Sequence, residues 1–516
     1  MSLNLAMILR ESAQRHPQNP ALTFEGNTLN YSTLDLRART FAGLLRDLGL
    51  RPGQHVALLL PDTPVFSFCY FGALYAGNPV VPLHPQLTLD ELTWHLEDSD
   101  AVALIAWGAN SSVAQRACAA VSACQTVLIS NEHGSLPISE TKASLQAQME
   151  RCTPISYLHP TSPEETAVLL YTSGTTGRAK ACELSHANLF FAAETNRGHI
   201  LPIGPQTVAM ACLPLHHAFG QLLHNALVSA GGHLVLAGAF DPYILLGLIQ
   251  QYGIQVLAAV PTMWLSVLYE PRLEEIDVSS LTYCITGGAA MPADKLLEVE
   301  ERLGVQLLEG YGTSEICATG AFNGLDDERR PGSIGRPTWG LEFRLVDENL
   351  TPITTPNAPG ELLVSGPTVM KGYYKRPALN ELALVDGWFR TGDIAQVDSE
   401  GYWRIVGRRK NMINRGGQPV FPLEIERVLC EHPDIAAAAV RGVTDSLLGE
   451  DVQALIVLKP TAHVAVSSLH QHCRERLAPY KRPRDILIVP HLDYGPTGKL
   501  ISQGHASPED TNRPAN

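Results

Sequence analysis

Short apolar runs alternate with helical segments from about residue 55 onward, and this alternation restricts the possible folds more than any other feature of the chain. "HVALLL" (55–60), "PVVPLH" (79–84) and "AVALIA" (101–106) have the pattern of buried strands. Between the first two, "FSFCYFGALYAG" (66–77) has the pattern of a helix that Gly77 ends. Strands that alternate with helices in this way are typical of parallel α/β layers. We therefore predict an α/β fold.

Capping residues mark two helix starts. Thr88 with Glu91 three residues later forms a capping box at the start of "TLDELTWHLEDS". Ser185 is the N-cap candidate of the helix "SHANLFFAAETN", which follows the strand "TAVLLYTSG" (166–174). We expect both helices to begin at these residues.

The length of 516 residues exceeds what one hydrophobic core supports, so more than one domain is expected. From about residue 333 the pattern changes to strands with Gly/Pro turns, as in "GSIGRP" and "GELLVSGP", and a new α/β pattern begins near Asn411. We predict four parts: a large N-terminal domain of layered α/β subdomains (1–410), a β-rich subdomain within it (about 333–408), a small α+β C-terminal domain (411–501) and a polar, disordered tail (502–516).

Composition excludes several function classes. The net charge of −14 argues against nucleic acid or an anionic membrane surface as the main partner. The ten cysteines include no Cys-x-x-Cys pair, which argues against a disulfide scaffold or a zinc site. Charged residues interrupt the N-terminal segment before a long apolar run can develop, so we expect no signal peptide, no membrane span and a cytoplasmic location.

One loop, "YTSGTTGRAK" (171–180), has the composition of a phosphate-binding loop. It is not a Walker P-loop, because Arg178 follows Gly177 where that motif needs lysine. A strand that enters a Gly/Thr-rich turn still offers several backbone N–H groups and hydroxyls to an anion, and Lys180 adds a positive charge. Taken alone, such a loop is more often an ordinary polar turn with a solvated lysine.

The loop has companions, and together they resemble the motifs of the adenylate-forming superfamily, which includes acyl- and aryl-CoA synthetases, non-ribosomal adenylation domains and firefly luciferase. The segments follow the family's order over nearly the whole chain: "YTSGTTGRAK" (171–180), "LPLHHAFG" (213–220), "VPTM" (260–263), "TGGAAMP" (286–292), "GYGTSE" (310–315), "WFRTGDIA" (388–395), "GYWRIVGRRK" (401–410), "GGQPVFPLEIE" (416–426) and "PTGKL" (496–500).

The resemblance implies a reaction in two steps. A carboxylate oxygen attacks the α-phosphorus of ATP and releases pyrophosphate, and CoA then takes the acyl group from the acyl-AMP. Two anions must approach each other in the first step, so positioning and positive charge carry the catalysis. The resemblance assigns the bridging cation to Lys499 and places His217 in the acyl pocket beside the reacting carbonyl.

The resemblance also implies roles for the remaining motif residues. The β- and γ-phosphates would be held by Thr172, Ser173, Gly174, Thr175, Thr176, Gly177 and Lys180. Adenine would lie between Tyr311, followed by Gly312, and the segment that contains Gly288, Ala289 and Ala290. Ser314 would contact the α-phosphate, Glu315 would ligate Mg²⁺, and Asp393 and Arg408 would contact the ribose. In the second step the C-terminal domain would rotate about Asn411 and present Gly416 and Gly417 to CoA.

The choice of substrates rests on smaller features. Residues 333–361 have the compact form of CoA ligases, and no carrier domain with its attachment site follows, so CoA is favoured over a carrier protein. The segment from Leu213 to Pro242 resembles medium- and long-chain fatty acyl-CoA ligases more than aryl-CoA ligases. Two alternatives stay open: an aryl or other carboxylate passed to CoA or to a carrier protein, and a catalytically silent nucleotide-binding homologue. Oligomeric state and pathway are not determined by the sequence.

Several positions depart from the family pattern. Ala179 and Ala181 flank Lys180 where the family has proline and glycine, His216 stands in the usual place of phenylalanine, and Pro419 replaces asparagine in the thiol-facing loop. If the second alanine position needs a positive φ, Ala181 costs about 1 kcal/mol.

Overall fold

The strand–helix alternation of the N-terminal half forms a mixed sheet that carries the predicted phosphate loop. The computed structural model describes residues 2–130, 144–172, 179–238, 240–324, 328–445, 447–459 and 462–492. Within these ranges seven strands form this sheet in the order β18-β8-β7-β4-β3-β5-β6. Their bounds are β3 His55–Leu59, β4 Val80–Pro82, β5 Ala101–Trp107, β6 Thr126–Ser130, β7 Thr166–Thr172, β8 Lys180–Ser185 and β18 Gly372–Tyr373.

A second sheet follows the order β15-β14-β13-β12-β11-β9-β10-β1-β2, and its central strands are parallel. Its strands are β1 Pro20–Phe24, β2 Asn27–Asn30, β9 Val208–Ala211, β10 His233–Leu236, β11 Val256–Ala259, β12 Tyr283–Gly287, β13 Leu307–Tyr311, β14 Ala321–Phe322 and β15 Arg336–Pro337. Because ligands bind beyond the carboxyl ends of parallel strands, the segments after β12 and β13 are the natural places for a binding site.

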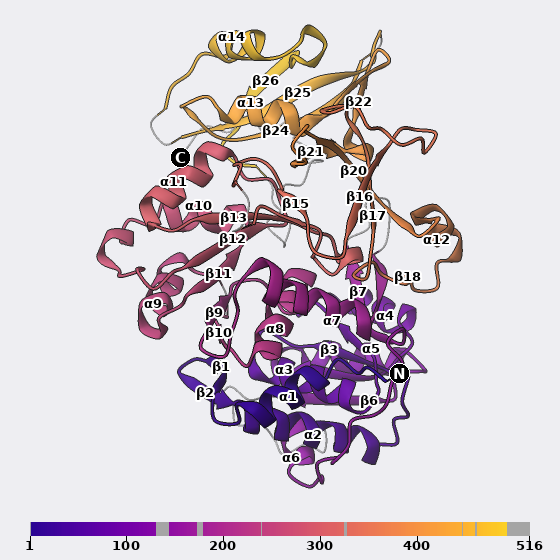
Figure 1. The fold of residues 1–516 in the computed structure, drawn as a ribbon. Helices are drawn as coiled ribbons and strands as arrows, with labels where there is room; N and C mark the ends of the chain where they lie inside the picture. The colour runs from indigo at the N-terminus through magenta and orange to yellow at the C-terminus, as the bar shows by residue number, and fades with distance from the viewer. Residues whose placement is uncertain are drawn as a thin grey trace, which may run out of the picture.

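The helices of the N-terminal part cover these sheets (Figure 1). They are α1 Met7–Arg15, α2 Tyr31–Asp47, α3 Pro64–Tyr75, α4 Leu89–Asp98, α5 Ser111–Ala120, α6 Leu145–Met149, α7 His186–Thr195, α8 Ala218–Ala230, α9 Pro242–Tyr252, α10 Pro261–Leu268 and α11 Ala293–Leu303, with short turns η1 Gly108–Asn110, η2 Asn196–Ile200, η3 Leu273–Glu275 and η4 Ser314–Ile316. Both predicted N-caps are confirmed: Thr88 and Glu91 form a capping box on α4, and Ser185 caps α7.

The region predicted to be β-rich contributes to three sheets. Antiparallel strands β16 Glu342–Val346, β17 Gly360–Ser365, β19 Leu384–Val385, β20 Trp388–Val397 and β21 Trp403–Arg408 form one sheet, with α12 Pro377–Ala383 beside it. The expected strand in "GSIGRP" is β15, which extends the second large sheet instead. Strand β18 joins the phosphate-loop sheet, where it pairs with β8.

The C-terminal part contains a separate sheet with helices on it, and it lies at the top of Figure 1. Its elements are β22 Ile413–Arg415, β23 Gln418–Val420, α13 Pro422–Cys430, β24 Ile435–Asp445, β25 Gly449–Leu458, α14 Val466–Arg476, η6 Pro479–Lys481 and β26 Asp485–Ile488. The short turn η5 Arg409–Asn411 connects it to β21. The predicted fold class, a large α/β N-terminal part with a smaller α+β C-terminal part, is confirmed. The predicted tail (502–516) lies outside the described residues.

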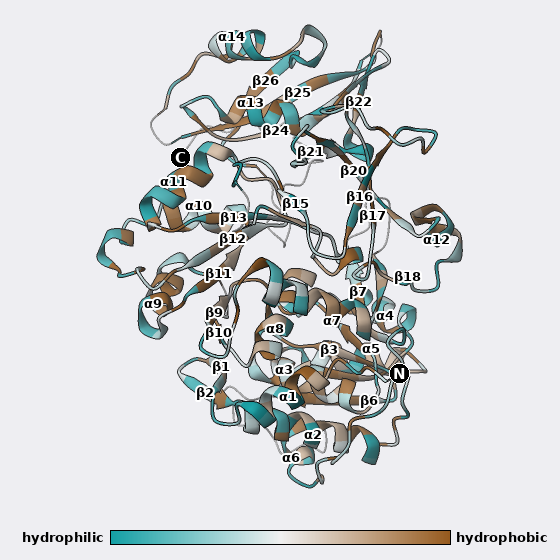
Figure 2. Cartoon of the chain, viewed as in Figure 1, coloured by the Kyte–Doolittle hydropathy of each residue, from teal (hydrophilic) through white to brown (hydrophobic). Residues whose placement is uncertain are grey.

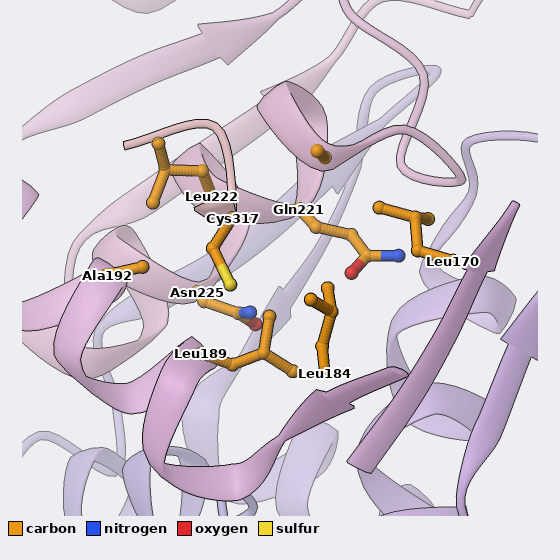
Figure 3. Close-up of a pocket in the computed structure, with 9 residues that line it drawn as sticks. Leu170, Leu184, Leu189, Ala192, Gln221, Leu222, Asn225 and Cys317 are labelled. Carbon is orange, nitrogen blue, oxygen red and sulfur yellow. The ribbon is translucent and has the colours of Figure 1, made fainter. Parts of the chain in front are cut away.

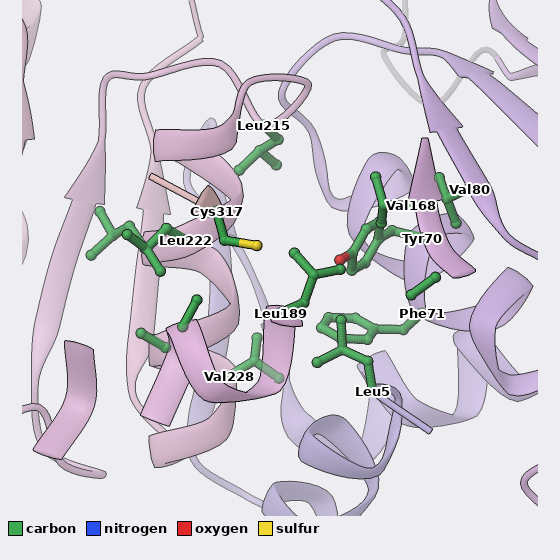
Figure 4. Packing of buried hydrophobic residues seen from close by; sticks show 14 of the residues in the cluster. Leu5, Tyr70, Phe71, Val80, Val168, Leu189, Leu215, Leu222, Val228 and Cys317 are labelled. Atoms are coloured by element: carbon green, nitrogen blue, oxygen red, sulfur yellow. The ribbon is translucent and has the colours of Figure 1, made fainter. Parts of the chain in front are cut away.

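The largest apolar core lies between the helices and the two large sheets. Helix α3 is buried along its length, including Phe66, Tyr70 and Phe71, and it packs in one cluster with Leu222 of α8 (Figure 4). Helices at the periphery, such as α11, expose a hydrophilic face (Figure 2). In the described part of the chain, no helix combines the length and the apolar character that crossing a membrane requires.

Candidate active site

The two strands that flank the predicted phosphate loop lie side by side. Thr172 at the end of β7 pairs with Lys180 at the start of β8, and the Thr172 hydroxyl donates a hydrogen bond of 3.4 Å to the Lys180 carbonyl. Ser173, Gly174, Thr175, Thr176 and Gly177 lie outside the described residues. Ala181 belongs to β8, opposite Tyr171, so its backbone is extended and the cost expected for a positive φ does not arise.

Lys180 and Glu315 meet through a tyrosine that the sequence motifs did not indicate. The Lys180 ammonium lies 4.4 Å from the centre of the Tyr373 ring. The Tyr373 hydroxyl donates a hydrogen bond of 2.8 Å to Oε1 of Glu315. Burial raises the pKa of Tyr373, so its hydroxyl remains a neutral donor. Strand β18 brings Tyr373 here from far along the chain, and a strand of two residues has no periodic pattern that sequence reasoning could detect.

The Glu315 carboxylate fits a Mg²⁺ ion that accompanies a nucleotide. Among the described residues no group of three metal-ligating side chains occurs. Mg²⁺ in nucleotide sites needs fewer, because one or two carboxylates suffice when phosphates and water supply the other oxygens. Glu315 lies in η4, and its carbonyl accepts a hydrogen bond of 2.8 Å from the Met370 N–H, which fixes the turn.

Asp393 connects a tyrosine and an arginine from two different sheets. The Tyr311 hydroxyl donates a hydrogen bond of 2.7 Å to Oδ2 of Asp393, and Nε of Arg408 lies 2.8 Å from Oδ1. Asp393 is only 2% exposed, whereas the Arg408 side chain is 44% exposed. The neighbouring Asp393 charge raises the pKa of Arg408, and burial raises the pKa of Tyr311. The cluster therefore consists of a buried carboxylate, Asp393, beside an exposed guanidinium group, Arg408.

The predicted adenine segments lie at the carboxyl ends of two neighbouring strands. Strands β12 and β13 are parallel neighbours with Gly287 opposite Gly310, so Gly288 and Tyr311 leave the sheet at the same end. Gly288, Ala289 and Ala290 are exposed there, and Gly288 has a φ of +82°. These exposed residues lie beside the carboxyl ends of both strands.

The turn after β13 is tightly folded. A Cβ on Gly312 would lie 2.3 Å from the backbone of Ala318, so only glycine fits. Cys317 and Ala318 both have left-handed backbones, with φ of 53° and 57°. Non-glycine residues in this region store strain, which the surrounding structure must hold in place. This geometry fixes Ser314 and Glu315 next to Tyr311.

Three histidines gather at the start of α8. His217 is the N-cap residue of α8, and its ring centre lies 4.5 Å from that of His216. His216 also contacts His84, with ring centres 4.7 Å apart. His216 is 7% exposed, and in the described chain neither of its ring nitrogens has a hydrogen-bond partner. Burial lowers the pKa of His216 well below its usual value, so this histidine is a neutral, packed side chain.

Leu215, which directly precedes these histidines, is held by the carboxylate of Asp62, a residue outside the sequence motifs. Oδ1 of Asp62 accepts a hydrogen bond of 2.7 Å from the Leu215 N–H. Burial raises the pKa of Asp62 to about 6. Asp62 follows β3, and only the folded arrangement brings it to Leu215.

The predicted hinge and CoA-facing residues lie in the C-terminal part. Asn411 is the last residue of η5, at the connection between β21 and β22. Gly416 and Gly417 form the turn of the β22–β23 hairpin with φ of +60° and +83°. The Gly416 N–H donates a hydrogen bond of 2.9 Å to the carbonyl of Leu448, which belongs to the same domain. Lys499 lies outside the described residues.

The site is thus formed by one short segment, residues 311–315. Its first residue, Tyr311, reaches Asp393 and Arg408, and its last residue, Glu315, reaches Tyr373 and, through the tyrosine ring, Lys180. One cluster, with Tyr311, Asp393 and Arg408, and another, with Glu315, Tyr373 and Lys180, therefore lie at the two ends of a five-residue segment. This spacing suits a nucleotide, which has a nucleoside at one end and phosphates at the other.

Comparisons with known proteins agree with this arrangement. The family of AMP-binding enzymes matches residues 9–374, and the family of AMP-binding enzyme C-terminal domains matches residues 424–499. A long-chain-fatty-acid–CoA ligase of Bacillus subtilis (strain 168) is 32% identical, covering 96% of this chain and 93% of its own length. A feruloyl-CoA synthase of an Amycolatopsis species is 33% identical, with coverage of 95% and 96%.

A solved structure has the same fold over almost the whole chain. The crystal structure of ATP-bound MatB from Rhodopseudomonas palustris matches with a TM-score of 0.90 and 28% sequence identity, and the match covers 97% of both chains. The chain therefore belongs to the AMP-binding enzymes of the adenylate-forming superfamily, and it is a carboxylate–CoA ligase with ATP and CoA as substrates.

Proposed function

We propose that this enzyme adenylates a medium- or long-chain fatty acid and transfers the acyl group to CoA. The single observation that carries the proposal is the segment Tyr311–Glu315, which has the Asp393 cluster at one end and the Lys180–Tyr373 contact at the other. In a nucleotide that spans this segment, we place the α-phosphate between the two ends, where Ser314 can contact it. This is the phosphorus that a carboxylate must attack.

Each end of the segment supports a different part of ATP. Asp393 has two carboxylate oxygens, and the exposed Arg408 beside it offers further donors, which suits the vicinal hydroxyls of ribose. Lys180 supplies positive charge at the mouth of the phosphate loop. The Glu315 carboxylate would hold Mg²⁺, which neutralises phosphate charge when it is bound.

In the chemical step, catalysis depends on the positions of the reacting groups and on positive charge beside them. The carboxylate oxygen forms a bond to the α-phosphorus, and the bond to pyrophosphate breaks. We propose that Lys499 bridges the two approaching anions and that His217 lines the pocket beside the reacting carbonyl. The thiol sulfur of CoA next attacks the carbonyl carbon, its proton is lost and AMP leaves. We propose that rotation about Asn411 exchanges Lys499 for the hairpin with Gly416 and Gly417 before this second step.

The nature of the acid is inferred from the walls beyond His217. Helix α8 contributes Leu222, Leu223 and Leu227 to the interior, and all three are buried. An apolar acyl chain suits such walls. The relative named for long-chain fatty acids favours this substrate, and the relative named for feruloyl-CoA, of equal similarity, makes an aryl acid the second candidate.

A panel of acids tests the proposal. Pyrophosphate release would be measured with decanoate, palmitate, benzoate, cinnamate, ferulate and oxalate, each with and without CoA. We expect release with the fatty acids and acyl-CoA as product when CoA is present. A preference for the aryl acids would establish the second candidate. No release with any acid would contradict both and would leave a catalytically silent homologue.

A further inference from the structure

Helix α8 carries a row of amide side chains that starts at the predicted reaction centre. Gln221 and Asn225 follow His217 at intervals of four residues, so all three lie on one face of the helix. The Gln221 N–H donates a hydrogen bond of 2.9 Å to the His217 carbonyl, which confirms the regular turn. Gln221 and Asn225 are each only 1% exposed. Polar groups thus extend from His217 into an otherwise apolar interior.

Both amides line a small cavity (Figure 3). Leu170 of β7, Leu184 of β8, Leu189 of α7 and Cys317 also line it. The cavity offers about 10 Å³ to an oxygen-sized group. This is enough for a single such group and too little for a ring or a carboxylate.

The amides retain unused hydrogen-bonding atoms. Within the residues that the structure describes, neither Nε2 nor Oε1 of Gln221 has a partner, and Oδ1 of Asn225 has none either. Only Nδ2 of Asn225 is engaged, at 3.3 Å from the Tyr70 hydroxyl. Buried polar atoms without partners are costly, and proteins retain few of them without a reason. A ligand group that enters the cavity would remove that cost.

Three of the lining residues lie close in sequence to predicted site residues. Leu170 lies two residues before Thr172, Cys317 lies two residues after Glu315, and Gln221 lies one helical turn after His217. In the proposed arrangement, the acyl chain extends from the carbonyl beside His217 along helix α8, and the cavity receives a group that this chain carries.

The hydrogen-bonding atoms that line the cavity determine which chemical group of a substrate it can bind. The unused atoms of Gln221 are one donor nitrogen and one acceptor oxygen. A hydroxyl satisfies both, because it accepts from Nε2 and donates to Oε1, whereas a ketone can only accept. No charged side chain is among the described residues that line the cavity, which disfavours a second carboxylate. We propose that Gln221 and Asn225 recognise a hydroxyl group on the acyl chain, so that the preferred substrate is a hydroxylated acid.

This inference rests on the proposed function, and matched acids test it separately. Adenylation would be measured with decanoic acids that carry one hydroxyl at successive positions, and with decanoic acid itself. We expect one hydroxyl position to raise kcat/KM at least about tenfold over decanoic acid. In Gln221→Met, which keeps an unbranched side chain of similar size, the hydroxylated acid should lose this advantage. Asn225→Leu should reduce the advantage in the same direction.

The free enzyme gives a second measurement. Because Gln221→Met replaces unpaired polar atoms by an apolar group, its melting temperature without substrate should equal or exceed that of the wild type. Leu222→Val, which alters the same cavity without removing a polar atom, should keep the preference for the hydroxylated acid. A lower melting temperature in Gln221→Met together with an unchanged substrate ratio would mean that the amides serve the fold through a buried water, and it would overturn the inference.

The two proposals fail in different ways. If the wild type adenylates decanoic acid as well as every hydroxylated acid, the hydroxyl inference is wrong and the proposed function stands. If no acid of the panel releases pyrophosphate, the proposed function itself is wrong.

Discussion

Tyr311 donates a hydrogen bond of 2.7 Å to Asp393, and this contact joins the carboxyl end of β13 in the second large sheet to the β-rich sheet. Asp393 lies opposite Arg408 in the register of β20 and β21, so the same carboxylate also anchors the arginine. The proposed ribose site therefore forms only when the two sheets are docked.

Asp393→Asn should weaken ATP binding. The substitution keeps the size of the side chain and one acceptor for Tyr311, but it removes the charge that pairs with Arg408. A hydrogen bond to a charged group contributes about 1.5–3 kcal/mol, so the KM for ATP should rise by roughly 10- to 100-fold. Kinetics at varied ATP and saturating acid measure this change.

Tyr311→Phe is the matched comparison for that variant. It keeps the ring that would lie against adenine and removes only the hydroxyl. The hydroxyl bonds to Asp393 and not to the nucleotide in the proposed site, and its loss leaves the Asp393 charge and its pair with Arg408 in place. Its effect on the KM for ATP should therefore stay below about tenfold. An effect larger than that of Asp393→Asn would contradict the proposed roles of these two residues.

Lys180→Gln should slow adenylation without unfolding the protein. Its ammonium lies against Tyr373 at the mouth of the phosphate loop, and loss of one aimed donor in such a site reduces kcat by roughly 10²-fold. Stopped-flow measurement of pyrophosphate release would show the loss.

Lys371→Gln is the control on the same sheet edge. Lys371 is an exposed residue that pairs with Glu183 at 2.6 Å, and exposed ion pairs contribute at most about 1 kcal/mol. Its adenylation rate should stay within about twofold of the wild type. A similar loss in both variants would indicate a general electrostatic effect and not a specific role of Lys180.

Local signals in the sequence predicted the fold well, and non-local contacts were missed. The capping box of Thr88 and Glu91 depends on residues three apart, so the sequence contains all of it. Tyr373 reaches Glu315 only because β18 pairs with β8, and no nearby pattern records this pairing. The same reason explains why "GSIGRP" was expected in the β-rich sheet, whereas β15 joins the sheet of β14.

The motifs predicted which residues belong to the site, but they did not predict which residues these would contact. Asp393 and Arg408 were both expected at the ribose, and the structure adds that they are opposite in one strand pair. The strain that a positive φ would cause at Ala181 does not arise, because the position belongs to an extended strand and not to the loop. Asp62 and Gln221 were not indicated because neither belongs to a motif, and only burial distinguishes them from ordinary polar residues.

Lys499→Ala should separate the two half-reactions. If Lys499 bridges the carboxylate and the α-phosphate, its loss should abolish pyrophosphate release, because two anions then meet without a counter-charge. Thioester formation from supplied acyl-AMP and CoA should remain largely intact. Equal loss of both half-reactions would contradict the assigned role.

Asn411→Pro should impair the second half-reaction more than the first. Proline fixes φ and removes an N–H, which restricts the backbone where η5 meets β22. If the C-terminal domain rotates at this residue, thioester formation from acyl-AMP should slow while pyrophosphate release stays near the wild-type rate. Asn411→Ala keeps the backbone free and should support both steps. An equal decrease of both rates in the proline variant would show that Asn411 is not the hinge.

Glu309→Gln should change the pH dependence of stability. Glu309 lies on β13, two residues before Tyr311, and is 8% exposed. Burial raises its pKa from 4.5 to about 7, although it accepts a hydrogen bond of 2.8 Å from the Gly332 N–H. The folded state therefore holds this proton more tightly than the unfolded state. The contribution of Glu309 to the free energy of unfolding decreases as the pH rises from about 4.5 to about 7, by at most about 3 kcal/mol.

The glutamine side chain keeps an acceptor for Gly332 and removes the charge. The variant should therefore melt at a higher temperature than the wild type near pH 8, and this gain should shrink as the pH falls toward about 5. Thermal unfolding at several pH values measures the difference. Glu301→Gln, at an exposed position of α11, provides the control and should show no such trend. A difference between Glu309→Gln and the wild type that is equal at both ends of the pH range would mean that Glu309 does not titrate there, and that its charge is stabilised by the arginines around it.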